Sequence, residues 1–310
     1  MTDAGEPVAA TPLAGTAGTS VGGPVVDAHV HVFAPEVIAE RERYLARDEW
    51  FDCLYADPKS RMVTGEQVLE EMDATGVAAS VIFGFAFHDQ GLCRETNDYV
   101  IEMVRAHPGR FTGLACVSPE EAGAVTELER CLDAGLRGAG ELFPDGQRFD
   151  LGDSPALDAV SLVLSAHCLP ILLHANEPVG HHYAGKGDNT PGPCFQFAQR
   201  HPDLKIVYAH MGGGLFFYEL MPRVRETLAN VYYDTAAVPY LYRPEVYRVG
   251  AELAGMHKLL FGSDYPLISP GRYLRDAGPL DPTLRKAIFS DNPLTVFGTG
   301  GVFGGDGVCT

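Results

Sequence analysis

Eight short runs of apolar, β-prone residues recur along the chain, and they constrain the fold more than any other feature of the sequence. Their hydrophobicity is continuous rather than alternating, which is typical of strands buried on both faces of a parallel sheet. Stretches with helical patterns separate them. The runs cover residues 25–33, 77–83, 111–117, 137–142, 170–174, 205–210, 231–234 and 258–264.

Helix-start signals lie between these runs. Thr64 stands three residues before Gln67, which predicts a capping box, and Ser118 and Ser154 each precede a proline. Eight strands that alternate with helices predict a single-domain (β/α)8 TIM barrel. The rival, an open doubly wound sheet, would carry a glycine-rich phosphate turn, and no such motif occurs.

Composition places the domain boundaries. Residues 1–24 and the glycine-rich residues 298–310 lack apolar periodicity, so we expect flexible tails around a barrel of residues 25–297. Residues 34–63 form an unusually long connection after the first strand, and loops beyond about 12–15 residues are usually functional or disordered. The aromatic residues of this connection predict a packed, lid-like insertion.

Charge and cysteine usage exclude several functions. The 310-residue chain carries 41 acidic and 23 basic residues, a net charge of −18. That balance disfavours nucleic acids, nuclease activity and anionic membranes as partners. There is no apolar run of membrane-spanning length and no signal-peptide pattern. Seven scattered cysteines without Cys-x-x-Cys favour the cytoplasm. We expect a small-molecule substrate, and the sequence leaves a homo-oligomer open.

Two histidines end the first apolar run. His29 and His31 stand two residues apart, so both side chains point to the same face of a strand, which in a barrel is the interior. Burying two polar rings is costly unless each has a partner. A metal ion is one such partner. The alternative is a pair of core histidines bonded to backbone or water.

Other strand ends carry polar residues as well. His174, His210 and Asp264 each terminate an apolar run. Barrel enzymes place their chemistry at the carboxyl ends of the strands, so we expect these side chains at one rim. Glu141 ends the fourth run. It could be a metal ligand, a bridge between two ions, a substrate contact, the ion-pair partner of Arg137 or an acidic loop residue.

As an ordered set, these motifs resemble the amidohydrolase superfamily. Within it the chain is similar to the "amidohydrolase 2" branch of aminocarboxymuconate-semialdehyde decarboxylase-like enzymes, which includes aromatic-acid decarboxylases. The resemblance covers most of residues 25–297. The motifs that carry it are Asp27-Ala-His-Val-His31, Leu173-His174, Ala209-His-Met-Gly-Gly213, Gly262-Ser-Asp-Tyr-Pro266 and Asp291-Asn-Pro293.

The resemblance implies one or two divalent metals at the barrel rim. By carry-over, His29, His31 and His174 are metal ligands, and Asp264 is a ligand and a proton shuttle. The resemblance makes His210 a ligand or an activator of substrate or water. No lysine ends the fourth run, where Glu141 stands, so a carbamylated-lysine bridge is not expected and the metal count is open.

Nitrogen and oxygen ligands suit zinc, with manganese or iron as alternatives. A metal-bound water, with Asp264 and His210 as catalytic groups, predicts hydrolysis of an amide, lactone or ester. The same apparatus fits a non-oxidative decarboxylase of a small aromatic or unsaturated acid. A third hypothesis is a non-catalytic binding protein on the same barrel, but all five family positions carry ligand-type residues, which favours an enzyme.

Four residues are predicted to contact the substrate. His88, His182 and Arg243 lie on loops after strand ends, which a barrel directs toward the mouth of its pocket. Arg243 would suit an anionic substrate. Trp50, the only tryptophan, lies in the long insertion.

Overall fold

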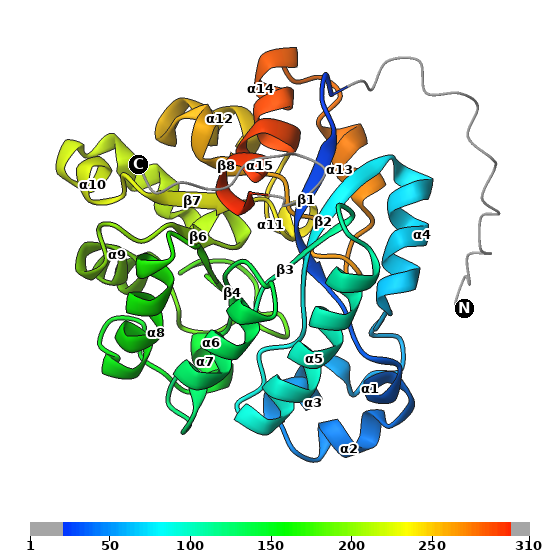
Figure 1. Ribbon diagram of the computed structural model, residues 1–310. Helices are drawn as coiled ribbons and strands as arrows, with labels where there is room; N and C mark the ends of the chain where they lie inside the picture. Colours follow the sequence, from blue (N-terminus) through cyan, green and yellow to red (C-terminus); the bar gives the residue numbers. More distant parts are fainter. Residues whose placement is uncertain (1–20, 299–310) are drawn as a thin grey trace, which may run out of the picture.

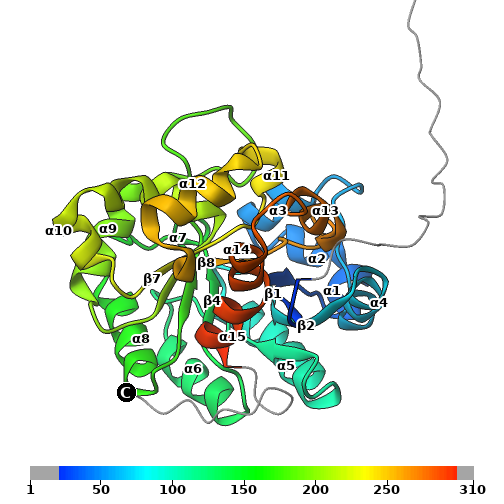
Figure 2. The same cartoon turned by 90° about the horizontal axis from the view of Figure 1, so that it is seen from above.

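Parallel strands surrounded by helices form the centre of the protein, seen from two directions in Figures 1 and 2. The structure is a computed structural model, and it describes residues 21–298. Most of both predicted tails, residues 1–20 and 299–310, lies outside the described residues. Val21, within the predicted N-terminal tail, is only 6% exposed and packs in the hydrophobic core.

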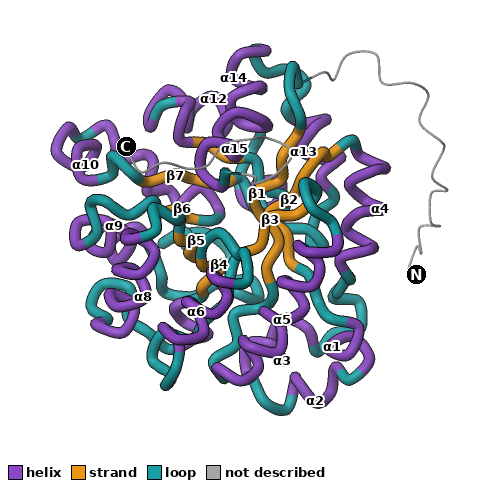
Figure 3. The backbone as a smooth tube through the Cα atoms, in the orientation of Figure 1, coloured by secondary structure: helices purple, strands orange, loops and turns teal. Residues whose placement is uncertain are grey.

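All eight predicted strands are present, and the tube in Figure 3 shows them at the centre of the fold. Most are shorter than their apolar runs, and in β1, β3, β5, β6 and β8 the residues at the carboxyl end of the run leave the sheet. The strands are β1 (Val25–His31), β2 (Val77–Phe83), β3 (Phe111–Gly113), β4 (Ala139–Leu142), β5 (Ile171–Leu173), β6 (Ile206–Tyr208), β7 (Val231–Asp234) and β8 (Leu259–Leu260).

Two ladders of parallel strands, β1 to β3 and β4 to β8, make up the sheet. Single bridges join them at both seams. Ala115 pairs with Ala139 between the ends of β3 and β4, and the Ala115 N–H donates to the Gly138 carbonyl at 3.0 Å. At the other seam the His31 N–H donates to the Tyr265 carbonyl at 2.8 Å. These contacts close the predicted (β/α)8 barrel.

Helices cover the outside of the strands, and α14 and α15 bring the end of the described chain beside β1 (Figure 1). No helix within residues 21–298 has the length and apolar character of a membrane span. The outer helices are α4 (Gly65–Thr75), α5 (Gln90–Ala106), α6 (Ala124–Asp133), α7 (Pro144–Gln147), α8 (Pro155–Ala166), α9 (Pro191–Arg200), α10 (Pro222–Thr227), α11 (Val238–Leu241), α12 (Glu245–Ala254), α13 (Pro270–Asp276), α14 (Pro282–Lys286) and α15 (Asn292–Phe297), together with the 3₁₀ segments η1 (His210–Leu220) and η2 (Met256–Lys258) and the π-helical turn η3 (Ala287–Asp291).

Two of the three predicted helix starts are confirmed. Thr64 caps α4 in a complete capping box, and the Ser154 side chain caps α8. The start predicted at Ser118 is wrong, since α6 begins only at Ala124. Gly123, with φ of 89°, takes the left-handed conformation immediately before the helix, so the chain turns between Ser118 and Ala124 instead of continuing as a helix.

The insertion of residues 34–63 contains three short helices, which lie side by side at one end of the barrel in Figure 1: α1 (Pro35–Ala39), α2 (Arg41–Leu45) and α3 (Glu49–Tyr55). Tyr44 and Phe51 are buried there against Phe85 and Phe87, which follow β2. This aromatic cluster packs the insertion onto the barrel. Its role as a lid stays a prediction.

A buried ion pair joins η1 to the start of β8. The Lys258 Nζ atom donates to Glu219 Oε2 at 2.8 Å and to the Leu228 carbonyl at 2.7 Å. The Tyr233 hydroxyl donates to the other Glu219 oxygen at 2.8 Å. Both charged side chains are almost fully excluded from solvent, so each depends on the other for compensation.

We expect Lys258→Met to lower the free energy of unfolding by about 3–5 kcal/mol, because it leaves the Glu219 carboxylate buried without its cation. Urea denaturation measures the change. Arg248→Ala is the control: its ion pair with Glu252 is largely exposed, and its loss should cost less than about 1 kcal/mol. Equal losses in the two variants would contradict the assignment.

Candidate metal centre

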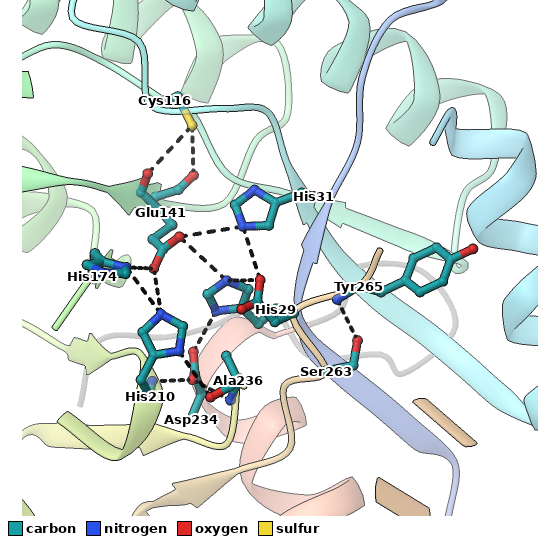
Figure 4. A network of polar contacts seen from close by, with 12 residues as sticks. His29, His31, Cys116, Glu141, His174, His210, Asp234, Ala236, Ser263 and Tyr265 are labelled. Atoms are coloured by element: carbon teal, nitrogen blue, oxygen red, sulfur yellow. Dashed lines mark hydrogen bonds and ion pairs between the residues drawn. The ribbon is translucent and has the colours of Figure 1, made fainter. Parts of the chain in front are cut away.

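Polar side chains from five strand ends converge at one rim of the barrel (Figure 4). Each is placed by the strand that precedes it, since the carboxyl ends of parallel barrel strands meet at one face. The six residues are His29 and His31 on β1, Glu141 on β4, His174 after β5, His210 after β6 and Asp264 after β8.

Four of these side chains surround one point. Glu141 Oε2 lies 3.6 Å from His29 Nε2 and 3.5 Å from His31 Nε2. Asp264 Oδ1 lies 3.7 and 3.5 Å from the same two nitrogens. Two ligands that bind zinc tetrahedrally at about 2.1 Å lie about 3.4 Å apart. The four atoms therefore have the separations expected around a single divalent cation.

The His29 ring supports this interpretation. Its Nδ1 atom contacts Asp234 Oδ2 at 2.8 Å, whereas its Nε2 atom is buried and has no hydrogen-bond partner in the structure. A buried polar atom without a partner costs about 1–3 kcal/mol. A cation bound among His29, His31, Glu141 and Asp264 would remove that cost, so these residues fit a divalent metal.

A second group uses the other oxygen of Glu141. His174 Nδ1 lies 3.0 Å from Glu141 Oε1 and 3.1 Å from His210 Nε2, which is itself 3.6 Å from Glu141 Oε1. Figure 4 shows the carboxylate between the two pairs of histidines. The family resemblance implied that His174 binds the metal together with His29 and His31, whereas in the structure His174 lies with His210. Glu141 faces these rings, so its charge needs no ion pair with Arg137.

Charges in the site hold each other in the ionised form. Burial raises the pKa of Glu141, but the charges of His29 and His174 outweigh it and hold that pKa well below its usual range. Burial likewise raises the pKa of Asp264, yet the neighbouring histidines lower it to about 2. For His210, burial lowers the pKa, whereas Glu141 and Asp264 raise it to about 9.

Backbone conformation places two of these side chains. His210 and Asp264 adopt φ values of 57° and 60°, the left-handed region that non-glycine residues rarely occupy. Such conformations persist where surrounding structure imposes them, and they cluster at functional sites. Gly213 follows in the same turn, and a Cβ atom there would lie 2.1 Å from the Asn176 carbonyl oxygen. Only glycine fits this close approach.

A cavity of about 510 Å³ opens over the site. Aromatic side chains form much of its wall, including Tyr55 of the insertion, Phe85, Phe143 and Tyr240. Its lining also includes His31, Glu141, His174, His210 and Asp264. A volume of this size matches a small organic ligand.

The four predicted substrate contacts are not all brought together. His182 lines the cavity. The described lining does not include His88, whose ring faces Glu121 at 3.8 Å, nor Arg243, whose exposed side chain pairs with Glu245. Trp50 packs edge-on against Phe143, with ring centroids 4.8 Å apart, so it supports the wall from behind.

Sequence reasoning missed two residues of the site. Asp234 ends the seventh apolar run, and the strand-end rule that selected Asp264 would have found it. Arg61 lines the cavity and is the only lysine or arginine in the described lining. It lies in the long insertion, where sequence spacing gives no signal of where a side chain points.

The chain belongs to the amidohydrolase family, because the family model described as "Amidohydrolase" matches residues 26–299. This confirms the resemblance drawn from the motifs.

Several solved structures are similar over nearly their whole length. The 5-carboxyvanillate decarboxylase from Sphingomonas paucimobilis is 21% identical, with a TM-score of 0.71, covering 89% of this chain and 99% of that chain. The enzyme of that name from Novosphingobium aromaticivorans, complexed with manganese and a nitrobenzoic acid, is 18% identical, with a TM-score of 0.74 and coverages of 91% and 97%. The 2,6-dihydroxybenzoate decarboxylase from Rhizobium is 20% identical, with a TM-score of 0.69 and coverages of 90% and 100%. At these identities the likeness establishes the fold.

We expect His31→Ala to weaken zinc binding by more than about 100-fold, beyond the 10–100-fold typical of losing a residue that only supports a ligand. Competition with a chelator measures the affinity. His88→Ala is the control, because that ring lies outside the cavity lining and should leave the affinity unchanged. Wild-type zinc affinity in His31→Ala would exclude His31 as a ligand.

Proposed function

We propose that this protein is a metal-dependent, non-oxidative decarboxylase of a small aromatic acid. The observation that carries the proposal is the cavity itself, in which aromatic walls and a single arginine face a cluster of metal-type ligands. The decarboxylases with similar folds support the same reaction class. This choice favours the second of the two enzymatic hypotheses from the sequence over hydrolysis.

Arg61 supplies the recognition of an anionic group. Its guanidinium lies over the Tyr265 ring, 5.4 Å from the centroid, and its Nη2 atom donates to the Tyr265 hydroxyl at 3.2 Å. This contact orients the group while leaving other N–H donors free for a carboxylate. A planar ring between Phe85, Phe143 and Tyr240 would meet aromatic faces and edges on several sides.

His29, His31, Glu141 and Asp264 would hold the cation, and His174 and His210 complete the second group around Glu141. A bound divalent cation supplies positive charge that binds and polarises anionic oxygens of the substrate. The donor set suits zinc, and manganese is the metal found in the Novosphingobium enzyme.

Decarboxylation exchanges a carboxylate for a hydrogen atom. The ring carbon gains a proton, the bond to the carboxylate breaks, its electron pair returns to the ring, and carbon dioxide leaves. Asp264 and His210 both line the cavity, so either can hold the proton beside the reacting carbon. We assign the transfer to Asp264 because its carboxylate faces the site that contains both β1 histidines. Since its low pKa leaves Asp264 ionised, it first takes a proton from His210, whose raised pKa keeps that ring protonated, and then passes the proton to the ring carbon.

Hydrolysis of an amide, lactone or ester is the second candidate. It is favoured by one observation, the sharing of Glu141 between two ligand groups, because paired metal sites are well suited to activate a water. In that reaction Asp264 would take the proton of the attacking water, and His210 would stabilise the negative charge that develops on oxygen.

Isotope incorporation separates the two reactions. The zinc- or manganese-loaded protein is incubated with 5-carboxyvanillate and 2,6-dihydroxybenzoate in D₂O, and with a panel of aryl esters, lactones and amides in H₂¹⁸O. We expect release of carbon dioxide and one deuterium at the vacated ring carbon. Incorporation of ¹⁸O into a hydrolysed product, without decarboxylation, would overturn the proposal in favour of hydrolysis. No turnover of any compound with metal bound would favour the binding-protein hypothesis.

Asp264→Asn should lower the turnover rate by about 10²–10⁴-fold, the usual contribution of a general acid or base, since an amide cannot carry the transferred proton. Metal content should fall much less, because His29, His31 and Glu141 remain. Steady-state rates and metal analysis of the same samples measure both effects. Asp276→Asn, whose side chain pairs with Arg272 outside the described cavity lining, is the matched control. Near-normal turnover in metal-loaded Asp264→Asn would assign the proton to another group.

A further inference from the structure

We propose that Asp234 is a positioning residue that selects the tautomer of His29, so that the ring presents a lone pair on Nε2 to the metal. The inference rests on the metal centre of the proposed function. It assigns a role to a buried carboxylate at the end of β7 that lines no part of the described cavity.

The contacts of Asp234 come from three sides. Its Oδ2 atom lies 2.8 Å from His29 Nδ1. Its Oδ1 atom accepts the backbone N–H of His210 at 3.0 Å and that of Ala236 at 2.9 Å. Asp234 and His29 are both fully buried, so water does not compete for these bonds. Figure 4 shows Asp234 between the His29 and His210 positions.

These contacts fix where the proton lies on His29. A carboxylate only accepts hydrogen bonds, so the Nδ1 atom that faces it must carry the proton. In the neutral ring the other nitrogen is then unprotonated and carries a lone pair. That nitrogen, Nε2, is the atom that faces Glu141 and Asp264 at 3.6 and 3.7 Å. A carboxylate behind a histidine ligand commonly fixes the orientation of the ring in this way.

The same carboxylate reaches the second ligand group. By accepting the N–H of His210, Asp234 holds that residue in its left-handed conformation, and by accepting the N–H of Ala236 it places the carbonyl that contacts His210 Nδ1 at 3.0 Å. The Nε2 atom of His210 therefore points toward Glu141. One buried side chain thus orients a histidine in each half of the site.

Asp234→Asn changes one atom and reverses the tautomer. Two backbone N–H groups face Oδ1, and because they can only donate, the oxygen of the new amide must stay on that side. The NH₂ group then faces His29 Nδ1 and donates to it. His29 moves its proton to Nε2, where it blocks the lone pair needed for the metal. The hydrogen bonds of the fold are otherwise preserved.

Asp27→Asn is the matched control. Asp27 is an equally buried carboxylate next to the same histidine, and its Oδ1 atom also accepts two backbone N–H groups, from His29 at 3.2 Å and from Ser263 at 2.8 Å. No histidine ring nitrogen within the described residues contacts it at hydrogen-bond distance. The two variants therefore make the same chemical change, a carboxyl group to an amide, at similar depth, and only one of them changes a ring tautomer.

The experiment measures binding of Zn²⁺ and Mn²⁺ by chelator competition, with circular dichroism as the check on folding. We expect Asp234→Asn to bind either metal about 10–100-fold more weakly than the parent protein, and Asp27→Asn to bind within about threefold of it. Wild-type affinity in folded Asp234→Asn, or an equal loss in Asp27→Asn, would overturn the inference. Failure of the parent protein to bind metal would instead overturn the proposed function.

A measurement on the parent protein keeps the test decisive if Asp234→Asn does not fold. In the zinc-loaded protein labelled with ¹⁵N-histidine, long-range ¹H–¹⁵N correlation spectra should place the His29 proton on Nδ1. If Asp234 only stabilised the fold, the proton could lie on either nitrogen of the His29 ring. A proton on Nε2 would contradict the assignment.

Discussion

The buried carboxylate of Glu141 is the group on which the rest of the site depends. Each of its oxygens faces two histidines, and all four ring nitrogens lie within 3.0–3.6 Å of it. Burial alone would favour a neutral carboxyl group, so its charge persists only because the rings, or a metal in place of their protons, compensate it. Removing that charge would leave two sets of converging nitrogens without a common partner.

Barrel closure is what brings these groups together. Glu141 lies on β4, beside one seam of the sheet, while His29 and His31 lie on β1, beside the other. The bond from the His31 N–H to the Tyr265 carbonyl closes the second seam within the site itself, so the same backbone contact that completes the barrel also places Asp264 opposite the β1 histidines. The backbone contacts that close the barrel therefore also position the ligands of the metal centre.

The strands and the rim residues could be predicted because buried strands and strand ends have short-range signatures. The His29 and His31 pair follows from period two, and Asp264 follows from its place after an apolar run. The division of the four histidines into two groups around Glu141 could not be predicted, because it depends on which carboxylate oxygen of Glu141 faces which histidine ring. Arg61 was also out of reach, because the packing of Tyr44 and Phe51 decides where the insertion places it. The missed turn at Ser118 reflects one left-handed glycine, which overrode a local helix signal.

The donor atoms of His29, His31, Glu141 and Asp264 define one cation site. Anomalous diffraction from crystals grown with manganese or zinc tests it most directly. We expect an anomalous peak about 2–2.3 Å from both Nε2 atoms and from one oxygen of each carboxylate. A further peak between His174 and His210 would show a second ion at the Glu141 carboxylate and would leave the assignment of the first site unchanged. A peak outside this rim, or none at saturating metal, would contradict it.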